Sequence, residues 1–281
     1  MASTRLLLCS DLDRTLIPNG PQPESPRARP LWRRLCARPE VAVAYVSGRD
    51  LGLIQAAIDD YGLPLPDFAI ADVGTSLYRR EQARWVLEPG WSEEIAADWA
   101  GWSSADLADL FRDCPELELQ PPECQKRFKL SYYLAPGPAP GPLLERMRAR
   151  LDDRGIRAAL VWSIDEVAGR GLLDLLPAGA TKYHAIEFLV RRGRFSADRT
   201  LFAGDSGNDL SVLVSPLRAV VVANALPQVK AEAMREAMAR GMADRIYVAR
   251  GGLLGMNGNY AAGVLEGAVH YFPEVEGWLR E

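Results

Sequence analysis

Histidine is scarce in this chain of 281 residues, which contains only His184 and His270. A transition-metal centre built on several imidazole ligands is therefore nearly excluded. The four cysteines form no CxxC pair, and Cys9 lies inside an apolar run. We expect reduced thiols in a cytoplasmic protein rather than a disulfide framework.

Long apolar runs and a basic excess are missing as well. The first apolar run, residues 6–9, is too short for a signal peptide, and no stretch approaches the length of a membrane span. The formal net charge is −4, whereas nucleic-acid-binding proteins usually carry a clustered basic excess. Since 48% of the residues are hydrophobic, the chain can build a real core. We expect a globular protein that acts on a small molecule and not on a membrane or a nucleic acid.

Short apolar segments alternate with helix-like segments near both ends of the chain. The expected strands are residues 6–10, 41–46, 68–71, 200–203, 219–222 and 245–248. The expected helices are residues 31–37, 51–61, 182–192, 229–239 and 260–271. Continuous apolar strands separated by helices predict an α/β fold with a doubly wound, mostly parallel sheet. Ligands of such sheets bind beyond the carboxyl ends of the strands.

The middle of the chain breaks this alternation. It contains an alternating strand at residues 129–134, a Pro/Gly linker at 136–142, a charged helix at 143–154 and a further strand at 158–162. Two strand-plus-helix units predict a small α+β domain inserted into the larger one. The predicted limits are 1–84 for the first part of the core, 85–172 for the inserted domain and 173–281 for the second part of the core.

Acidic residues follow two of the expected core strands. Asp11 and Asp13 come directly after the first strand, and residues at positions i and i+2 of an extended segment project to the same side. Asp205 and Asp209 follow the strand at residues 200–203. Carboxylates gathered at strand ends suit a hard cation such as Mg²⁺. The sequence therefore predicts a phosphoryl-transfer site with Mg²⁺ held by these four residues, although Asp209 has the alternative role of orienting a lysine.

The same residues can perform the chemistry of a phosphatase. Asp11 can attack phosphorus to form an aspartyl phosphate, and Asp13 can protonate the leaving oxygen and later activate water. The hydroxyl of Ser47 and the backbone N–H groups near Gly48 can bind a phosphoryl oxygen. Lys182 supplies a point charge to the same group.

Four motifs occur in a fixed order: a DxDxT strand end, a serine strand end, a lysine and a GDxxND segment. Alone, each has an ordinary explanation as a turn, a loop, a surface cation or a helix cap. In this order they resemble the haloacid dehalogenase-like phosphatases, and the resemblance covers essentially the whole chain. It implies a Rossmann-like core and a cap of the kind found in the subgroup that acts on sugar phosphates.

Within that superfamily the chain is similar to the bacterial and plant sucrose-phosphate phosphatases. Residues 73–78, 128–134, 174–177 and 204–209 carry this similarity. The resemblance implies that the inserted domain contacts the sugar through Gln125, Lys129 and Tyr132. Asp174 is a further expected contact, and it lies with Arg170 where the chain returns from the inserted domain. An alternating strand buries every second residue in any case, so simple packing is the open alternative for these residues.

The resemblance also implies substrate contacts from four core residues: Thr15, Gly48, Arg49 and Asn208. One departure from the family pattern is Ser47, because threonine is common at this position, but serine keeps the hydroxyl.

The motifs predict a Mg²⁺-dependent phosphomonoesterase, and the resemblance implies sucrose 6-phosphate as its substrate. The inserted domain would act as a lid that excludes water. Alternatives with the same chemistry are a mannosylfructose-phosphate phosphatase, a phosphatase for another sugar phosphate and a phosphosugar mutase. A non-catalytic sugar-phosphate-binding module is the alternative from another class. We expect a monomer, and a sugar-phosphate synthase is the candidate partner.

Overall fold

The computed structural model describes residues 5–82, 84–137, 140–165, 169–193 and 195–281. The chain forms two compact units, Met1–Leu87 with Lys182–Glu281 and Glu88–Thr181. Strand β5 (Arg84–Leu87) belongs to the sheet of the first unit, and β9 (Arg170–Pro177) to the sheet of the second. The units therefore divide at residues 87 and 181, whereas the sequence places the limits at 84 and 172. A core with an inserted domain remains our proposal for the domain organisation.

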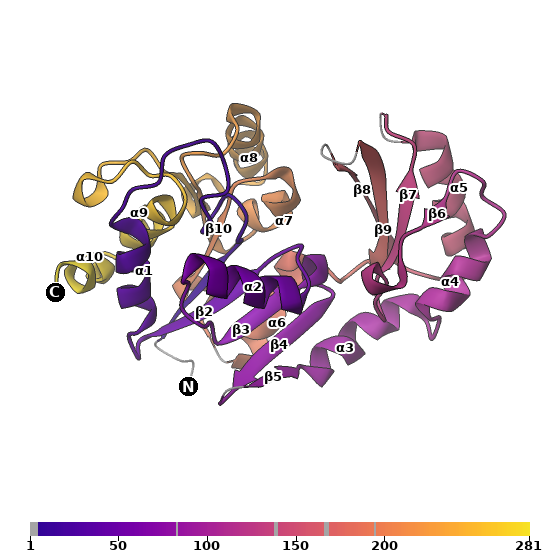
Figure 1. Ribbon diagram of the computed structural model, residues 1–281, viewed down its shortest axis with the longest axis horizontal. Coiled ribbons are helices and arrows are strands. Elements are labelled where there is room, and N and C mark those ends of the chain that lie inside the picture. Colours follow the sequence, from indigo (N-terminus) through magenta and orange to yellow (C-terminus); the bar gives the residue numbers. More distant parts are fainter. Residues whose placement is uncertain (1–4, 83, 138–139, 166–168, 194) are drawn as a thin grey trace. The chain divides into compact units, whose positions relative to one another are not determined.

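The first unit is built on an eight-stranded sheet in the order β12-β11-β10-β1-β2-β3-β4-β5. Figure 1 labels β10 and β2 to β5 of this sheet. The first six strands in this order pair in parallel, and β4 and β5 are added antiparallel. Their bounds are β1 Leu6–Ser10, β2 Val41–Val46, β3 Phe68–Ala71, β4 Ser76–Glu81, β10 Thr200–Gly204, β11 Arg218–Val221 and β12 Ile246–Val248. The expected α/β fold with a mostly parallel sheet is thus confirmed.

Helices cover both faces of this sheet. One core cluster joins side chains of β1 such as Leu6 and Leu8 to helices α1 (Ala28–Cys36), α2 (Leu51–Tyr61), α9 (Ala261–Tyr271) and α10 (Glu274–Arg280). Leu7 and Cys9 alternate to the other face. Helix α7 (Leu210–Leu213) contacts β10, β11, α6 (Lys182–Gly193) and α8 (Pro227–Ala239). Every residue of β1 and β2 is buried, as expected for central strands of a sheet covered on both faces.

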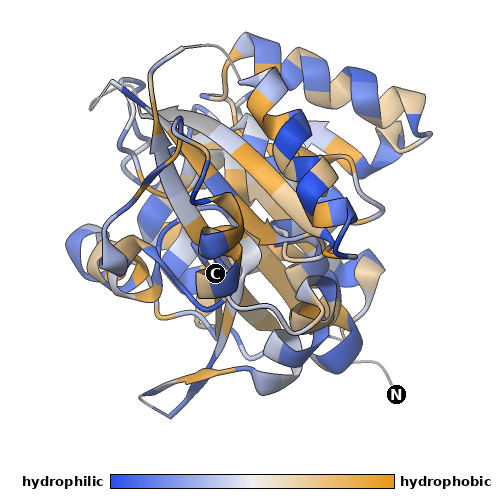
Figure 2. Ribbon diagram, turned by 90° about the vertical axis from the view of Figure 1, so that its right-hand side faces the viewer, coloured by the Kyte–Doolittle hydropathy of each residue, from blue (hydrophilic) through white to orange (hydrophobic). Residues whose placement is uncertain are grey.

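The second unit contains a four-stranded antiparallel sheet in the order β6-β7-β9-β8. Strand β6 is Glu118–Leu119, β7 is Leu130–Leu134 and β8 is Ala158–Asp165. Its helices are α3 (Pro89–Ala96), α4 (Ser104–Phe111) and α5 (Gly141–Asp152). Hydrophilic and hydrophobic residues alternate along the helices in Figure 2, as expected where one helix face is buried.

Two expectations about the whole chain can be compared with this fold. The four cysteines, Cys9, Cys36, Cys114 and Cys124, are free thiols in this structure. None of the helices in the described ranges combines the length and the apolar character that crossing a membrane requires.

Candidate active site

The carboxyl ends of two adjacent central strands bring three carboxylates together. Strands β1 and β10 pair in parallel, and the backbone N–H of Asp11 donates to the carbonyl of Ala203 at 2.9 Å. Asp11 and Asp205 therefore begin the loops that leave neighbouring strands. Carboxylate oxygens of Asp11, Asp205 and Asp209 lie within 4.8 Å of one another, and all three residues are buried. Three of the four acidic residues expected at this edge of the sheet therefore lie close together, and Asp13 lies outside the group.

Lys182 enters this group from the start of α6. Its Nζ lies 3.2 Å from Asp11 Oδ1, 2.7 Å from Asp209 Oδ1 and 3.1 Å from Asn208 Oδ1. The lysine is only 2% exposed. A buried ammonium is costly unless it is paired and hydrogen-bonded, and here three oxygens satisfy its three donors.

Asp209 organises the turn after β10. Its Oδ2 accepts from the backbone N–H groups of Asp205 and Ser206 and from the Ser206 hydroxyl, while Oδ1 bonds to Lys182. A Cβ on Gly204 would lie 2.6 Å from Asp209 Oδ2, so glycine is required for this close approach. Both oxygens of Asp209 are thus engaged within the protein, which favours its alternative role of orienting Lys182.

Asp13 points to a different partner. Its carboxylate accepts from Arg49 Nη2 at 2.7 Å and Arg49 Nε at 2.8 Å, and from Asn19 Nδ2 at 2.7 Å. The side chain of Asp13 is 40% exposed. It lines the same hollow as Asp11 without joining the three carboxylates.

The hollow beside these residues has a volume of about 610 Å³. Besides Asp11 and Asp13 it is lined by Arg14, Gly48, Arg49, Leu53, Asp205, Ser206, Gly207, Asn208, Leu226 and Val229. Three of the four core residues expected to contact substrate, Gly48, Arg49 and Asn208, line it. Thr15 is fully buried instead, and its hydroxyl lies 3.5 Å from Asp205 Oδ1.

Ser47 follows β2, the strand on the other side of β1. Its N–H donates to the carbonyl of Ile70 at 2.8 Å, and its hydroxyl accepts from the N–H of Arg49 at 3.2 Å. Ser47 is 1% exposed. The strand end therefore fixes Ser47 and presents Gly48 and Arg49 to the hollow.

Burial and neighbouring charges set the pKa values of these groups. Burial raises the pKa of Asp11 to about 8, opposed by Lys182 and aided by Asp209 and Asp205. Burial also raises the pKa of Asp205 to about 6, against the pull of Arg14.

The other two groups shift in the direction of their ion pairs. Burial alone would lower the pKa of Lys182, but Asp11 and Asp209 raise it above its ordinary value. Burial would raise the pKa of Asp13, but the hydrogen bonds and charge of Arg49 hold it below its usual range. Asp13 and Lys182 are therefore ionised at neutral pH.

The residues present fit a divalent metal ion. The donors are carboxylate oxygens, the ligands that Mg²⁺ prefers, and one oxygen from each of three buried residues lies within 4.8 Å of the others. Both oxygens of Asp209 already have partners, so Asp11 and Asp205 are the candidates for holding such an ion.

Arg14 is a site residue that sequence reasoning missed. Its Nε lies 3.0 Å from Asp205 Oδ2, and its backbone adopts a left-handed conformation with φ +57°. Asn19 accepts from the Arg14 N–H at 2.8 Å, and Asn224 donates to the Arg14 carbonyl at 2.6 Å. Arg14 lies between Asp13 and Thr15 in the DxDxT motif, and this position was the available signal. No local pattern indicated that its partner is Asp205.

In the second unit, three of the four expected sugar contacts form one network around Ser131. Lys129 Nζ lies 2.8 Å from Ser131 Oγ and 3.2 Å from Asp174 Oδ1, and Ser131 Oγ donates to Asp174 Oδ1 at 2.6 Å. The Gln125 amide bonds the N–H and the carbonyl of Ser131. The network is built on β7 and β9, where Ser131 and Asp174 are opposite each other.

Tyr132 does not join this network. It alternates to the other face of β7 and is 3% exposed, and its hydroxyl has no hydrogen-bond partner among the described residues. Burial raises the pKa of this phenol above its ordinary value. Arg170 is half exposed and lies over the ring of Tyr133, 4.7 Å from its centroid.

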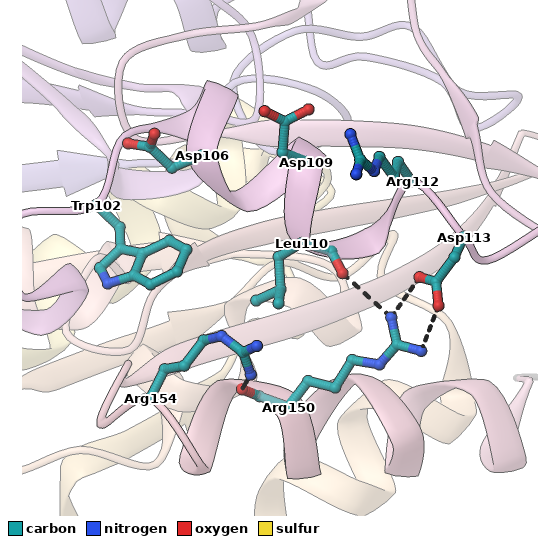
Figure 3. A pocket seen from close by; sticks show the side chains of 8 residues that line it. All are labelled: Trp102, Asp106, Asp109, Leu110, Arg112, Asp113, Arg150 and Arg154. Carbon is teal, nitrogen blue, oxygen red and sulfur yellow. Dashed lines mark hydrogen bonds and ion pairs between the residues drawn. The ribbon is translucent and has the colours of Figure 1, made fainter.

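The second unit also contains a hollow of its own, of about 720 Å³, between α4 and α5 (Figure 3). Arg150 reaches across it to the Asp113 carboxylate, at 2.5 and 2.9 Å, and to the carbonyl of Leu110. The remaining lining residues are Trp102, Asp106, Asp109, Arg112 and Arg154. Its charged groups lie at the surface, and no buried carboxylate is among its lining residues.

The sheet order, the acidic strand ends and the buried lysine define a phosphoryl-transfer enzyme of the haloacid dehalogenase-like class. The model of the sucrose-6F-phosphate phosphohydrolase family matches residues 4–272. The chain belongs to the sucrose-6F-phosphate phosphohydrolase family.

Individual relatives agree with this membership. A protein of Nitrosococcus oceani, named among HAD-like hydrolases, is 52% identical over 98% of this chain and 74% of its own length. The mannosylfructose-phosphate phosphatase of Agrobacterium fabrum is 29% identical over 79% of this chain and 84% of its own length. The sucrose-phosphatase of Synechocystis sp., solved in complex with sucrose and phosphate, is 26% identical with a TM-score of 0.72, covering 96% of this chain and 98% of that chain.

Proposed function

We propose that this protein is a Mg²⁺-dependent phosphatase that hydrolyses sucrose 6-phosphate to sucrose and phosphate. The observation that carries the proposal is the buried Asp11, held 3.2 Å from Lys182 and beside Asp205 at the wall of an open hollow. Membership of the family supports a sugar phosphate as the substrate class. The sucrose and phosphate bound to the Synechocystis enzyme support a disaccharide.

In the first step an Asp11 carboxylate oxygen attacks phosphorus, and the bond between phosphorus and the sugar oxygen breaks. Asp13 gives a proton to that oxygen, so that sucrose leaves as an alcohol and an aspartyl phosphate remains. Lys182 offsets the negative charge of the transferring group, since its ammonium already lies against Asp11. Ser47 and Gly48 provide uncharged donors at the end of β2.

In the second step Asp13 removes a proton from water, and the water oxygen attacks the phosphorus of the aspartyl phosphate. The bond from phosphorus to Asp11 breaks, phosphate is released and both carboxyl groups return to their starting states. The hydrogen bonds and charge of Arg49 hold the pKa of Asp13 below its usual range, so Asp13 is ionised and free to accept a proton in this step. The acid role in the first step requires that Asp13 leave Arg49 and take up a proton from solvent before the sugar oxygen departs. Its side chain is 40% exposed, so water can reach it.

A bound Mg²⁺ would supply positive charge that lets an anionic nucleophile approach an anionic phosphate. We propose Asp11 and Asp205 as its protein ligands, with Asp209 holding Lys182 in place. Asp13 is assigned to proton transfer because its carboxylate lies outside the group of three.

Phosphate release from a panel of esters tests the substrate. With Mg²⁺ present, kcat/KM for sucrose 6-phosphate should exceed that for fructose 6-phosphate and glucose 6-phosphate by on the order of 10²-fold, because unpaired polar groups penalise a missing ring. Comparable kcat/KM values for all three sugar phosphates would show that the protein does not recognise a disaccharide.

The network around Ser131 gives a matched pair of variants for that panel. Lys129→Ala should reduce the ratio of kcat/KM for sucrose 6-phosphate to kcat/KM for the two monosaccharide phosphates. It should have little effect on kcat/KM for a small aryl phosphate. Arg146→Ala, which removes an exposed ion pair with Glu116 in the same unit, serves as the control and should leave the preference unchanged. If the two variants changed the substrate preference equally, the network around Ser131 would have no part in sugar recognition.

Mannosylfructose phosphate is the second candidate substrate, and the Agrobacterium relative is the observation that favours it. A preference for this ester in the same panel would keep the chemistry and change the substrate. A synthase that makes the sugar phosphate is the partner class that either substrate requires, and we propose a monomeric, cytoplasmic enzyme. Absence of phosphate release from every ester would favour a non-catalytic binding module.

A further inference from the structure

The buried cluster contains a charge imbalance. Asp11, Asp205 and Asp209 carry three negative charges when ionised. Among the residues that the structure describes, the cations in contact with them are Lys182 and Arg14. Two positive charges against three negative ones leave one carboxylate uncompensated. An uncompensated buried carboxylate is costly, and this is the state from which a divalent ion would bind.

The two cations are held in different ways. Lys182 is buried, contacts two carboxylates and an amide oxygen, and has no room to leave. Arg14 forms an ion pair with Asp205, and its side chain, which lines the hollow, is 33% exposed. Its guanidinium makes one further and longer contact, from Nη2 to the carbonyl of Asn224 at 3.4 Å.

The backbone of Arg14 is fixed even though its side chain is accessible. Asn19 and Asn224 bind its N–H and its carbonyl, and Asn224 Oδ1 also accepts from the N–H of Tyr260 at 2.7 Å. The side chain of Arg14 can therefore rotate into the hollow while its backbone keeps its position.

Charge balance then separates the two possible bound states. A divalent ion beside the three carboxylates gives an excess of one positive charge if both Lys182 and Arg14 stay. If Arg14 leaves, the ion and Lys182 neutralise the three carboxylates. Like charges in a partly buried site repel strongly, so the second state is favoured.

We propose that Arg14 is a positioning residue that holds Asp205 in the metal-free protein and is displaced from it when the metal ion binds. This rests on the proposed metal dependence of the function. Arg14 acts as a competitor built into the chain, and it lowers metal affinity while preventing Asp205 from being buried as an unpaired charge.

Arg49 provides the matched control. It is the other arginine that lines the hollow, and it pairs with Asp13, which lies outside the three carboxylates. A general electrostatic effect of removing a nearby cation would act in both arginine variants. Competition for a metal ligand would act only in the Arg14 variant.

The first test measures Mn²⁺ and Mg²⁺ affinity by calorimetry at pH 8 in wild type, Arg14→Met, Arg14→Lys and Arg49→Met. We expect Arg14→Met to bind the ion about tenfold more tightly, the effect of removing one competing charge-assisted hydrogen bond. Arg49→Met should differ from wild type by less than about threefold, and Arg14→Lys should restore the weaker binding because it restores the cation. Equal gains in both methionine variants, or no gain in Arg14→Met, would overturn the proposal.

The left-handed backbone of Arg14 calls for a second variant. Asparagine tolerates a positive φ, so Arg14→Asn removes the cation at low conformational cost if Arg14→Met fails to fold. It should give the same gain in affinity.

The second test uses the wild-type protein and reads the Arg14 Nε–H signal by ¹⁵N NMR during titration with Mg²⁺. The signal should shift and exchange faster with water as the ion saturates the site. A signal that stays unchanged at saturation would overturn the proposal and leave the proposed function intact. A wild-type protein that binds no divalent ion would instead refute the metal dependence on which the proposed function depends.

Discussion

The hollow on the inserted unit is larger than the hollow beside Asp11, about 720 against about 610 Å³. The larger one is lined by surface charges that pair across helices, as Arg150 does with Asp113. The smaller one has buried carboxylates converging on a buried lysine. Exposed pairs are inexpensive and contribute little, whereas buried charges are costly and are kept where chemistry uses them. Burial and convergence of charge, and not volume, therefore locate the active site.

The strongest way to break this comparison is to remove one carboxylate from each hollow. Asp11→Asn should reduce turnover below about 10⁻⁴ of wild type, because an amide is a poor nucleophile for phosphorus. Asp113→Asn should leave kcat/KM unchanged. Steady-state phosphate release, with circular dichroism to verify folding, measures both. Comparable losses would show that the larger hollow participates in the reaction.

The next largest effect concerns Asp13, which lines the smaller hollow outside the buried group. Asp13→Asn should lower kcat for sucrose 6-phosphate by on the order of 10²–10⁴, the usual contribution of a general acid or base. An ester whose leaving group needs no proton should lose less in the first step, as single-turnover kinetics would report. A rate within a few-fold of wild type for both esters would exclude the acid–base role.

A stability measurement sharpens the contrast between buried and exposed cations. Lys182→Met leaves Asp11 and Asp209 buried without their cation and should lower the free energy of unfolding by about 3–5 kcal/mol in metal-free protein. Arg150→Met removes an exposed pair and should cause no measurable change. Urea unfolding monitored by tryptophan fluorescence compares them. An equal loss in both variants would contradict the account of burial.

A smaller effect is the pH dependence of stability in EDTA-treated protein. The folded-state pKa values of Asp11 and Asp205, about 8 and about 6, lie above the unfolded value near 4. The folded state therefore binds protons more tightly, and stability is lost as pH rises through these values. The melting temperature should fall by several degrees between pH 5.5 and 8.5, and Mg²⁺ should reduce the fall because the ion replaces the protons.

Asp11→Asn is the control for that experiment, because it removes one of the two titrating groups. Its melting temperature should depend less on pH than that of wild type. An identical pH dependence in the two proteins would assign the effect to groups elsewhere.

The sequence predicted the central strands and their acidic ends because the information is local. An uninterrupted apolar run followed by Asp11 specifies a buried parallel strand and the polar edge where it stops. The same holds for Asp205 after β10. Pairing of β1 with β10 then follows from the fold class, and it brings both residues together.

Local sequence patterns could not predict the partners of long side chains. Arg14 pairs with a residue 191 positions away, and Arg49 with one 36 positions away, so tertiary structure selects both contacts. Tyr132 shows a related difficulty. The family resemblance indicates which strand faces the sugar, but the alternation of side chains along that strand decides which of them reach a surface. The limits of the inserted unit differ for a similar reason, because β5 is a short, mostly exposed strand without a clear apolar pattern.

The covalent step at Asp11 is the most direct test of the whole account. With p-nitrophenyl phosphate, a good leaving group makes the first step independent of Asp13, so Asp13→Asn should release one equivalent of nitrophenol in a burst and then turn over slowly. Mass spectrometry of the acid-quenched protein should locate one phosphoryl group on Asp11. No burst in this variant and no phosphoryl group on Asp11, while the wild type turns over the same ester, would contradict the account.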